Sequence, residues 1–285
     1  MLRGLCPHTF TCKDSCLLAT YGPAFLLTLF AGLSTGIGAG LAFFTKPGDT
    51  RFLSIGMGFS AGVMIYISFV EILPKSQNEF IAAYGAIGGE VLGLLCFFGG
   101  IALAFLIDHF IPEDVNPHEF KSKNEIRTLK SNTAVLKRTG VFTAVAIAIH
   151  NFPEGFATFV SALDSLALGV PIALAIAIHN IPEGMAVSLP IYHATGKRRT
   201  AFWYAFASGL AEPVGALVGY FLLAPLMGEL TLGITFGFVA GMMIYISFDE
   251  LLPSARVYGN AHTTILGIVL GMLVMALSLI GFALI

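Results

Sequence analysis

Long runs of apolar residues, separated by short polar stretches, dominate the hydrophobicity pattern of the chain. Several of these runs exceed the roughly 18 residues that indicate a membrane-crossing helix. Eight spans are expected near residues 20–44, 52–73, 86–111, 140–163, 168–192, 200–224, 232–253 and 262–285. A segment in lipid must satisfy its own backbone hydrogen bonds, and the alternation of a β-barrel is missing from the sequence. The pattern therefore predicts an all-α, polytopic membrane protein with eight transmembrane helices.

The composition agrees with a lipid environment. Hydrophobic residues make up 56% of the chain and charged residues 11%, whereas a soluble domain carries roughly a quarter charged residues. No segment between the runs is long enough to form a folded enzyme domain. We expect an external N-terminal arm, residues 1–19, and one membrane domain, residues 20–285, with a loop at 112–139. The expected surroundings are the lipid bilayer, and no nucleic-acid partner is expected.

The distribution of Lys and Arg predicts the orientation. With eight spans, both termini share one side of the membrane with the basic residues Arg3, Lys13 and Lys75. The other side holds Lys46, Arg51, Lys121, Lys123, Arg127, Lys130, Lys137, Arg138, Lys197, Arg198, Arg199 and Arg256. Because cytoplasmic loops carry an excess of Lys and Arg, we expect external termini and a cytoplasmic 112–139 loop. The protein is then a multi-pass protein of the cell (inner or plasma) membrane.

The cysteines are divided between the arm and one span. Cys6, Cys12 and Cys16 lie in the arm with His8. They fit a disulfide with one odd thiol, a loose metal-gathering arm, or incidental thiols of a short tail, and the sequence leaves these open. Cys96 lies in an apolar span, where packing is the expected role.

Internal repeats relate the two halves of the chain. Residues 58–74, GFSAGVMIYISFVEILP, match 237–253, GFVAGMMIYISFDELLP, without a gap, and the first span resembles the sixth. A third pair is HNFPEGFA at 150–157 and HNIPEGMA at 179–186. The copies lie an odd number of spans apart, so they cross the membrane in opposite directions. This predicts an inverted 3+2+3 repeat, a plan of secondary transporters that bind substrate near the midplane.

Polar residues in the middle of three spans are the candidate metal ligands. They are His150, Asn151 and Glu154 in span four, His179, Asn180 and Glu183 in span five, and Glu212 in span six. A lone charge at this depth costs at least about 3 kcal/mol, so the carboxylates must face one another, a cation or water. His and Glu four residues apart share one helix face. A polar cluster that only joins the helices is the alternative reading.

Each of the three glutamates adjoins a proline, namely Pro153, Pro182 or Pro213. A proline inside a helix removes one backbone hydrogen bond, so we expect kinks that give room to an ion. Imidazole, amide and carboxylate ligands without sulfur suit Zn(II), with Fe(II), Mn(II) and Co(II) as alternatives. Such an ion is the transported substrate, and no cofactor is expected.

Three further carboxylates are candidate gates of the ion pathway. Glu71 is expected near the external end of span two, and Asp249 and Glu250 near the cytoplasmic end of span seven. Glu71 and Glu250 occupy the same place in the gapless repeat. Carboxylates at each mouth would concentrate cations, although charges near span ends are also common without such a role.

An intramembrane zinc-dependent hydrolase is the second hypothesis. The zincin spacing HExxH is missing from the sequence, and no separate nucleophile or base stands beside the candidate ligands. The candidate ligands occur in two copies. Such a duplication suits a transport pathway that opens to each side of the membrane in turn better than it suits an asymmetric enzymatic reaction. The prediction is therefore a transporter and not an enzyme.

The HNFPEG and HNIPEG pair, the 3+2+3 plan and the external termini resemble the ZIP (Zrt/Irt-like protein) family of divalent metal importers. The likeness extends over nearly the whole chain from about residue 20. It implies import toward the cytoplasm, a homodimer and a binuclear metal centre. One ion would be held by His150, Glu154, His179 and Glu183, and a second by Asn151, Glu154, Asn180, Glu183 and Glu212.

Overall fold

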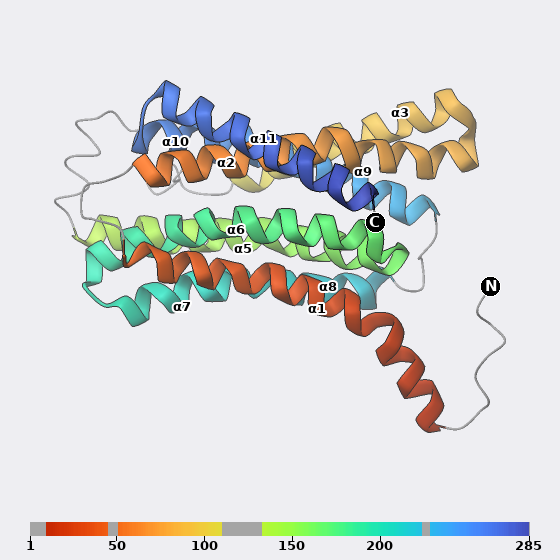
Figure 1. The fold of residues 1–285 in the computed structure, drawn as a ribbon, viewed down its shortest axis with the longest axis horizontal. Coiled ribbons are helices and arrows are strands. Elements are labelled where there is room, and N and C mark those ends of the chain that lie inside the picture. Colours follow the sequence, from red (N-terminus) through yellow and green to blue (C-terminus); the bar gives the residue numbers. More distant parts are fainter. Residues whose placement is uncertain (1–9, 45–50, 110–132, 224–228, 285) are drawn as a thin grey trace.

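The computed structural model describes residues 10–44, 51–109, 133–223 and 229–284, and within these ranges helices account for nearly every residue (Figure 1). The elements are α1 (Phe10–Ala42), α2 (Arg51–Ile67), η1 (Ser68–Ile72), α3 (Leu73–His109), α5 (Thr133–Asp164), α6 (Leu166–Thr195), α7 (Arg198–Gly209), α8 (Ala211–Leu223), α9 (Glu229–Ile246), η3 (Ser247–Leu251), α10 (Leu252–Tyr258) and α11 (Ala261–Ala283). The two η elements are π-helical turns. The predicted all-α class is confirmed for these ranges.

Six segments of the described ranges are long and apolar enough to cross a membrane. They are Tyr21–Ala42, Arg51–His109, Gly169–Tyr192, Arg198–Phe221, Leu230–Arg256 and Ala261–Gly281. The helix α5, which carries the first HNxPEG motif, is not among them. Its basic start at Lys137 and Arg138 and its central Glu154 lower its apolarity.

The second of these segments reverses direction at Gly85. This residue has φ 75° and ψ 170°, a left-handed conformation inside α3 that glycine adopts without a steric cost. A methyl group at Gly93 would touch Gln77, and one at Gly89 would overlap Ile81. In a straight helix, residues 77 and 93 would lie about 24 Å apart. The two parts of α3 therefore run side by side as a helical hairpin.

The helices form two layers (Figure 1). One layer contains α1, α5, α6, α7 and α8, and the other contains α2, α3, α9, α10 and α11. In the first layer α1 packs on α6, and α5 packs on α6 and α8; in the second, α3 packs on α9 and α2 on α11. Contacts of α2 with α6 join the layers. The two central helices α5 and α6 thus lie among neighbours on several sides, where their polar residues are shielded from lipid.

The three prolines beside the glutamates differ in their place relative to the helix ends. The helices α5 and α6 continue through Pro153 and Pro182, because the loss of one backbone hydrogen bond leaves the following turns intact. The helix interruption lies at Leu210, between α7 and α8, three residues before Pro213. One of the three sites therefore has a helix interruption beside it, and the kinks expected at Pro153 and Pro182 stay a prediction. The break places Glu212 in the first turn of α8.

Two expected boundaries also shift. The helix α1 begins at Phe10, within the expected arm, and α5 begins at Thr133, within the expected 112–139 loop. Both segments are polar extensions of an apolar helix, and helical hydrogen bonding continues there beyond the apolar run. Cys6 lies outside the described residues, as do the side chains of Cys12 and Cys16.

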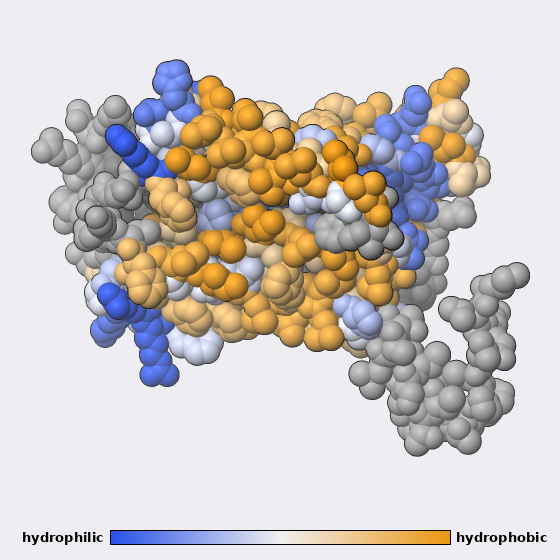
Figure 2. All heavy atoms as spheres, in the orientation of Figure 1, coloured by the Kyte–Doolittle hydropathy of each residue, from blue (hydrophilic) through white to orange (hydrophobic). Residues whose placement is uncertain are grey.

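The outer surface matches a membrane environment. Figure 2 shows a broad apolar face with hydrophilic residues gathered toward the two ends. Leu26, Leu95 and Phe221 are each more than 60% exposed. Large apolar side chains that face outward in such numbers are explained by contact with lipid.

Candidate cation-binding centre

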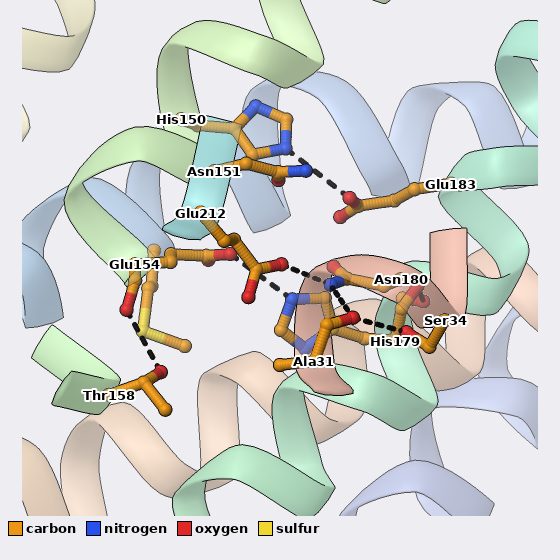
Figure 3. Close-up of polar contacts among 12 residues, drawn as sticks. Ala31, Ser34, His150, Asn151, Glu154, Thr158, His179, Asn180, Glu183 and Glu212 are labelled. Carbon is orange, nitrogen blue, oxygen red and sulfur yellow. Dashed lines mark hydrogen bonds and ion pairs between the residues drawn. The ribbon is translucent and has the colours of Figure 1, made fainter. Parts of the chain in front are cut away.

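The polar residues predicted from the sequence converge between α5, α6 and α8 (Figure 3). His150, Asn151 and Glu154 come from α5, His179, Asn180 and Glu183 from α6, and Glu212 from α8. All seven side chains are buried, none being more than 5% exposed. The HNxPEG spacing places His and Glu on the same face of each helix, and the close packing of α5 on α6 brings the two faces together.

The histidines and glutamates of the two motifs contact each other across the helices. Nε2 of His150 lies 3.5 Å from Oε2 of Glu183, and Nε2 of His179 lies 3.3 Å from Oε2 of Glu154. Each imidazole therefore faces the carboxylate of the opposite motif copy. As the side chains are placed, no three His, Cys, Asp or Glu residues of the described ranges are grouped closely enough to hold a metal ion.

The side-chain amide groups of the two asparagines donate hydrogen bonds to neighbouring helices. Nδ2 of Asn151 donates to the Ser208 carbonyl oxygen at 3.3 Å, and Nδ2 of Asn180 donates to that of Ala31 at 3.0 Å. Asn180 also donates to Oε1 of Glu212. These bonds fix the amide groups, so that the donors point at the surrounding helices.

Five oxygen atoms of the cluster are buried without a hydrogen-bond donor from the protein. They are Oδ1 of Asn151, Oε1 of Glu154, Oδ1 of Asn180, Oε1 of Glu183 and Oε2 of Glu212. Buried polar atoms are nearly always partnered, because an unpartnered one loses its hydration without compensation. Such a concentration of oxygen acceptors has the chemistry of a cation-binding site, and oxygen and imidazole ligands suit divalent transition metals.

The glycine of each motif permits the close helix contact. A methyl group at Gly155 would overlap the Glu212 carbonyl oxygen of α8, and one at Gly184 would overlap the Thr35 carbonyl oxygen of α1. A small residue at these positions lets the helices approach closely, as is common within membranes. The motif thus combines ligand chemistry with the packing that gathers the ligands.

The expected gate residues lie in the two π-helical turns. Glu71 belongs to η1, and Asp249 and Glu250 belong to η3. The two turns cover equivalent residues of the 58–74 and 237–253 repeat. Oε2 of Glu250 lies 3.8 Å from Nδ1 of His150, so this carboxylate reaches the centre itself and not only the helix end at which it was expected. Glu71 is partly buried, and the nearby Lys75 pairs with Asp164 at 2.5 Å.

Two functional contacts were missed by the sequence argument. The Ser60 hydroxyl of α2 donates to the His179 carbonyl oxygen at 3.0 Å, which ties the second layer to the centre. The contact of His150 with Glu250 is another link between the layers. For Ser60 the sequence gave only its polarity as a clue, whereas the repeat had already indicated Glu250 as a candidate gate. The helix register that joins both residues to α5 and α6 is not visible in the sequence.

An apolar outer belt, two layers of long helices and a buried cluster of acceptors together define a multi-pass membrane protein with a polar centre. The sequence profile of the family described as ZIP Zinc transporter matches residues 19–108 and 111–279. The chain therefore belongs to the ZIP family of metal transporters.

Curated relatives agree over most of their length. The protein named Zinc transporter ZupT of Campylobacter jejuni is 57% identical over 278 residues, which cover 90% of this chain and 95% of that protein. Proteins of the same name from Clostridium perfringens and Streptococcus mutans are 52% and 54% identical, over 91% of this chain. Because the family consists of transporters, the hydrolase hypothesis is set aside.

Proposed function

We propose that this protein imports divalent transition metal ions, above all zinc, through the centre of α5, α6 and α8. Membership of the ZIP family and the names of the curated relatives support transport of zinc. The structural observation that carries the proposal is the set of five buried, donor-free oxygen atoms. These atoms accept no hydrogen bond from the protein around them, and a cation supplies a favourable partner.

The centre holds two ions in this proposal. His150, Glu154, His179 and Glu183 bind the first, and the contacts between opposite motifs already bring these four side chains together. Asn151, Glu154, Asn180, Glu183 and Glu212 bind the second, and each of these five contributes one donor-free oxygen. Glu154 and Glu183 bridge both ions, since each has one oxygen near a histidine and one oxygen without a donor.

The protein crosses the membrane eight times in an inverted 3+2+3 arrangement. The reversal at Gly85 divides the Arg51–His109 segment into two spans, and α5 adds one to the remaining five. The matching η1 and η3 turns support the inverted repeat. The helix pairs support it too, because the packing of α2 on α11 in one half corresponds to the packing of α9 on α3 in the other. The positive-inside distribution supports external termini in the inner membrane, and the ion moves inward. We propose a homodimer on family resemblance alone.

The carboxylates of η1 and η3 act at the two ends of the pathway. Glu71 attracts cations at the external side, and Asp249 and Glu250 receive them from the centre on the cytoplasmic side. The contact between Glu250 and His150 supports this last step, because it connects a candidate ligand directly to the next carboxylate. Fe(II), Mn(II) and Co(II) are further substrates of the same ligand chemistry.

Metal uptake into proteoliposomes tests the proposed function. We expect wild-type protein to accumulate zinc, and Glu183→Gln to reduce uptake to the background of empty liposomes, because the variant removes the bridging charge. Glu90→Gln is the matched control, since Glu90 is an exposed carboxylate of α3 far along the chain from the centre. A panel of Fe(II), Mn(II) and Co(II) ranks the substrates. Normal zinc uptake by Glu183→Gln at equal incorporation would contradict the proposal.

A further inference from the structure

The contacts around the centre follow a local twofold pattern. Residues 24–39 align without a gap with 201–216, which pairs Ala31 with Ser208. The motif copies pair Asn151 with Asn180. Asn151 donates to the Ser208 carbonyl oxygen, and Asn180 donates to the Ala31 carbonyl oxygen. Each hydrogen bond is thus the counterpart of the other.

Glycine contacts follow the same pattern. Gly155 lies against the Glu212 carbonyl oxygen, and its counterpart Gly184 lies against the Thr35 carbonyl oxygen. Gly32 and Gly209, which are also counterparts, lie against each other's carbonyl oxygens. The packing of α1 on α6 is therefore equivalent to the packing of α8 on α5. In this arrangement Thr35 is the counterpart of Glu212.

Thr35 is fully buried, and its hydroxyl oxygen has no hydrogen-bond partner. Threonine in a helix usually donates to the carbonyl oxygen four residues earlier, as Thr28 does to Ala24 and Thr158 does to Glu154. For Thr35 this acceptor is Ala31, which already accepts from the Ser34 hydroxyl and from Asn180. A buried hydroxyl without a partner requires an explanation.

We propose that Thr35, which occupies in α1 the position that Glu212 occupies in α8, is a further cation-binding residue. This inference rests on the proposed function. Its oxygen joins those of Asn151, Glu154, Asn180, Glu183 and Glu212, which makes a set of six oxygens. Sets of oxygen ligands favour the harder divalent ions, Mn(II) in particular. Exact twofold symmetry would place a fourth carboxylate at position 35. The neutral hydroxyl found there instead limits the negative charge of the centre, so that the bound ion can still leave.

Titration of zinc and manganese into the purified, full-length protein in lipid nanodiscs tests the role of the hydroxyl. Thr35→Val keeps the shape and removes the oxygen, whereas Thr35→Ser keeps the oxygen and removes a methyl group. We expect Thr35→Val to weaken manganese binding about tenfold, corresponding to the loss of one ligand interaction, and to weaken zinc binding less. Thr35→Ser should stay within about twofold of wild type on the same scale. Unchanged binding in Thr35→Val, or equal losses in both variants, would overturn the inference.

An exchange of the two side chains gives a second test. We expect Glu212→Thr alone to weaken zinc binding, and Thr35→Glu added to it to recover most of the loss, because the carboxylate then enters from the counterpart position. A double variant that is folded but binds no better than Glu212→Thr would refute the counterpart position of Thr35. If the double variant does not fold, the Val and Ser comparison decides. Weaker binding in Glu183→Gln with normal binding in Thr35→Val would reject this inference alone, whereas normal binding in both would also reject the proposed centre.

Discussion

At the scale of single residues, the centre separates donors from acceptors. The amide groups of the two asparagines donate to carbonyl oxygens of α1 and α7, while the side-chain oxygens of the same residues have no donor. Glu154 and Glu183 each place one oxygen near an imidazole and leave the other without a donor. The donors therefore hold the candidate ligands in place, and in the proposed function the free oxygen atoms are presented to a cation. This arrangement reduces the reorganisation needed when an ion arrives.

The two asparagines are not equivalent in this arrangement. Asn180 bonds the Ala31 carbonyl oxygen and the Glu212 carboxylate, whereas Asn151 donates to the uncharged Ser208 carbonyl oxygen. We expect Asn180→Ala to weaken zinc binding more than Asn151→Ala, by about 1.5–3 kcal/mol, the usual contribution of a hydrogen bond to a charged group. Calorimetric titration of both variants measures the difference. Equal losses in the two variants would show that the bond to Glu212 does not support the site.

At the scale of helices, close backbone contacts determine the positions of the candidate ligands. The glycines of both motifs lie directly on carbonyl oxygens of α1 and α8. These contacts leave no room for a side chain, so the separation of α6 from α1 and of α5 from α8 is fixed. A change in the separation of α6 from α1 would displace Asn180 from Ala31, and a change in the separation of α5 from α8 would displace Glu154 relative to Glu212. Helix packing is in this way connected to the proposed cation binding.

A methyl group at Gly184 tests this connection. We expect Gly184→Ala to destabilise the protein by about 1–3 kcal/mol, the usual range for overpacking, and to reduce zinc uptake. Gly22→Ala is the matched control, because no atom lies within 4 Å of the added methyl group in α1. Alanine there should be neutral or stabilise the helix by up to about 1 kcal/mol. Thermal melting in detergent and zinc uptake report the two effects, and a normal Gly184→Ala protein would show that the contact is not required.

The sequence predicted which polar residues gather at the centre better than it predicted how the helices around them pack. The seven central residues could be found because charges and imidazoles are costly in apolar spans, and because residues four apart share a helix face. The roles of Ser60 and Thr35 depend on which turns of different helices face each other, and this register is a tertiary property. The π-helical turns and the continuous helices at Pro153 and Pro182 likewise depend on packing that overrides local preference.

At the scale of the whole molecule, the seven central residues belong to one layer, and the other layer contacts them at a few points. Ser60 reaches the His179 carbonyl oxygen, and Glu250 reaches His150. A further link, between Lys75 and Asp164, lies away from the centre and is partly exposed. Otherwise the two layers share a buried apolar cluster, which includes Met64 of α2, Phe156 of α5 and Ile176 of α6. Apolar packing of this kind is compatible with movement of one layer against the other, which a pathway open to each side in turn requires.

The central claim is that the two HNxPEG motifs jointly hold the transported ion, and anomalous diffraction from crystals grown with zinc tests it most directly. We expect anomalous peaks between the Glu154 and Glu183 carboxylates, with the imidazoles of His150 and His179 about 2.0–2.1 Å from one ion, the usual Zn–N distance. The peaks should vanish in Glu183→Gln crystals. Zinc bound only elsewhere in the chain, with no peak between the two motifs, would contradict the account.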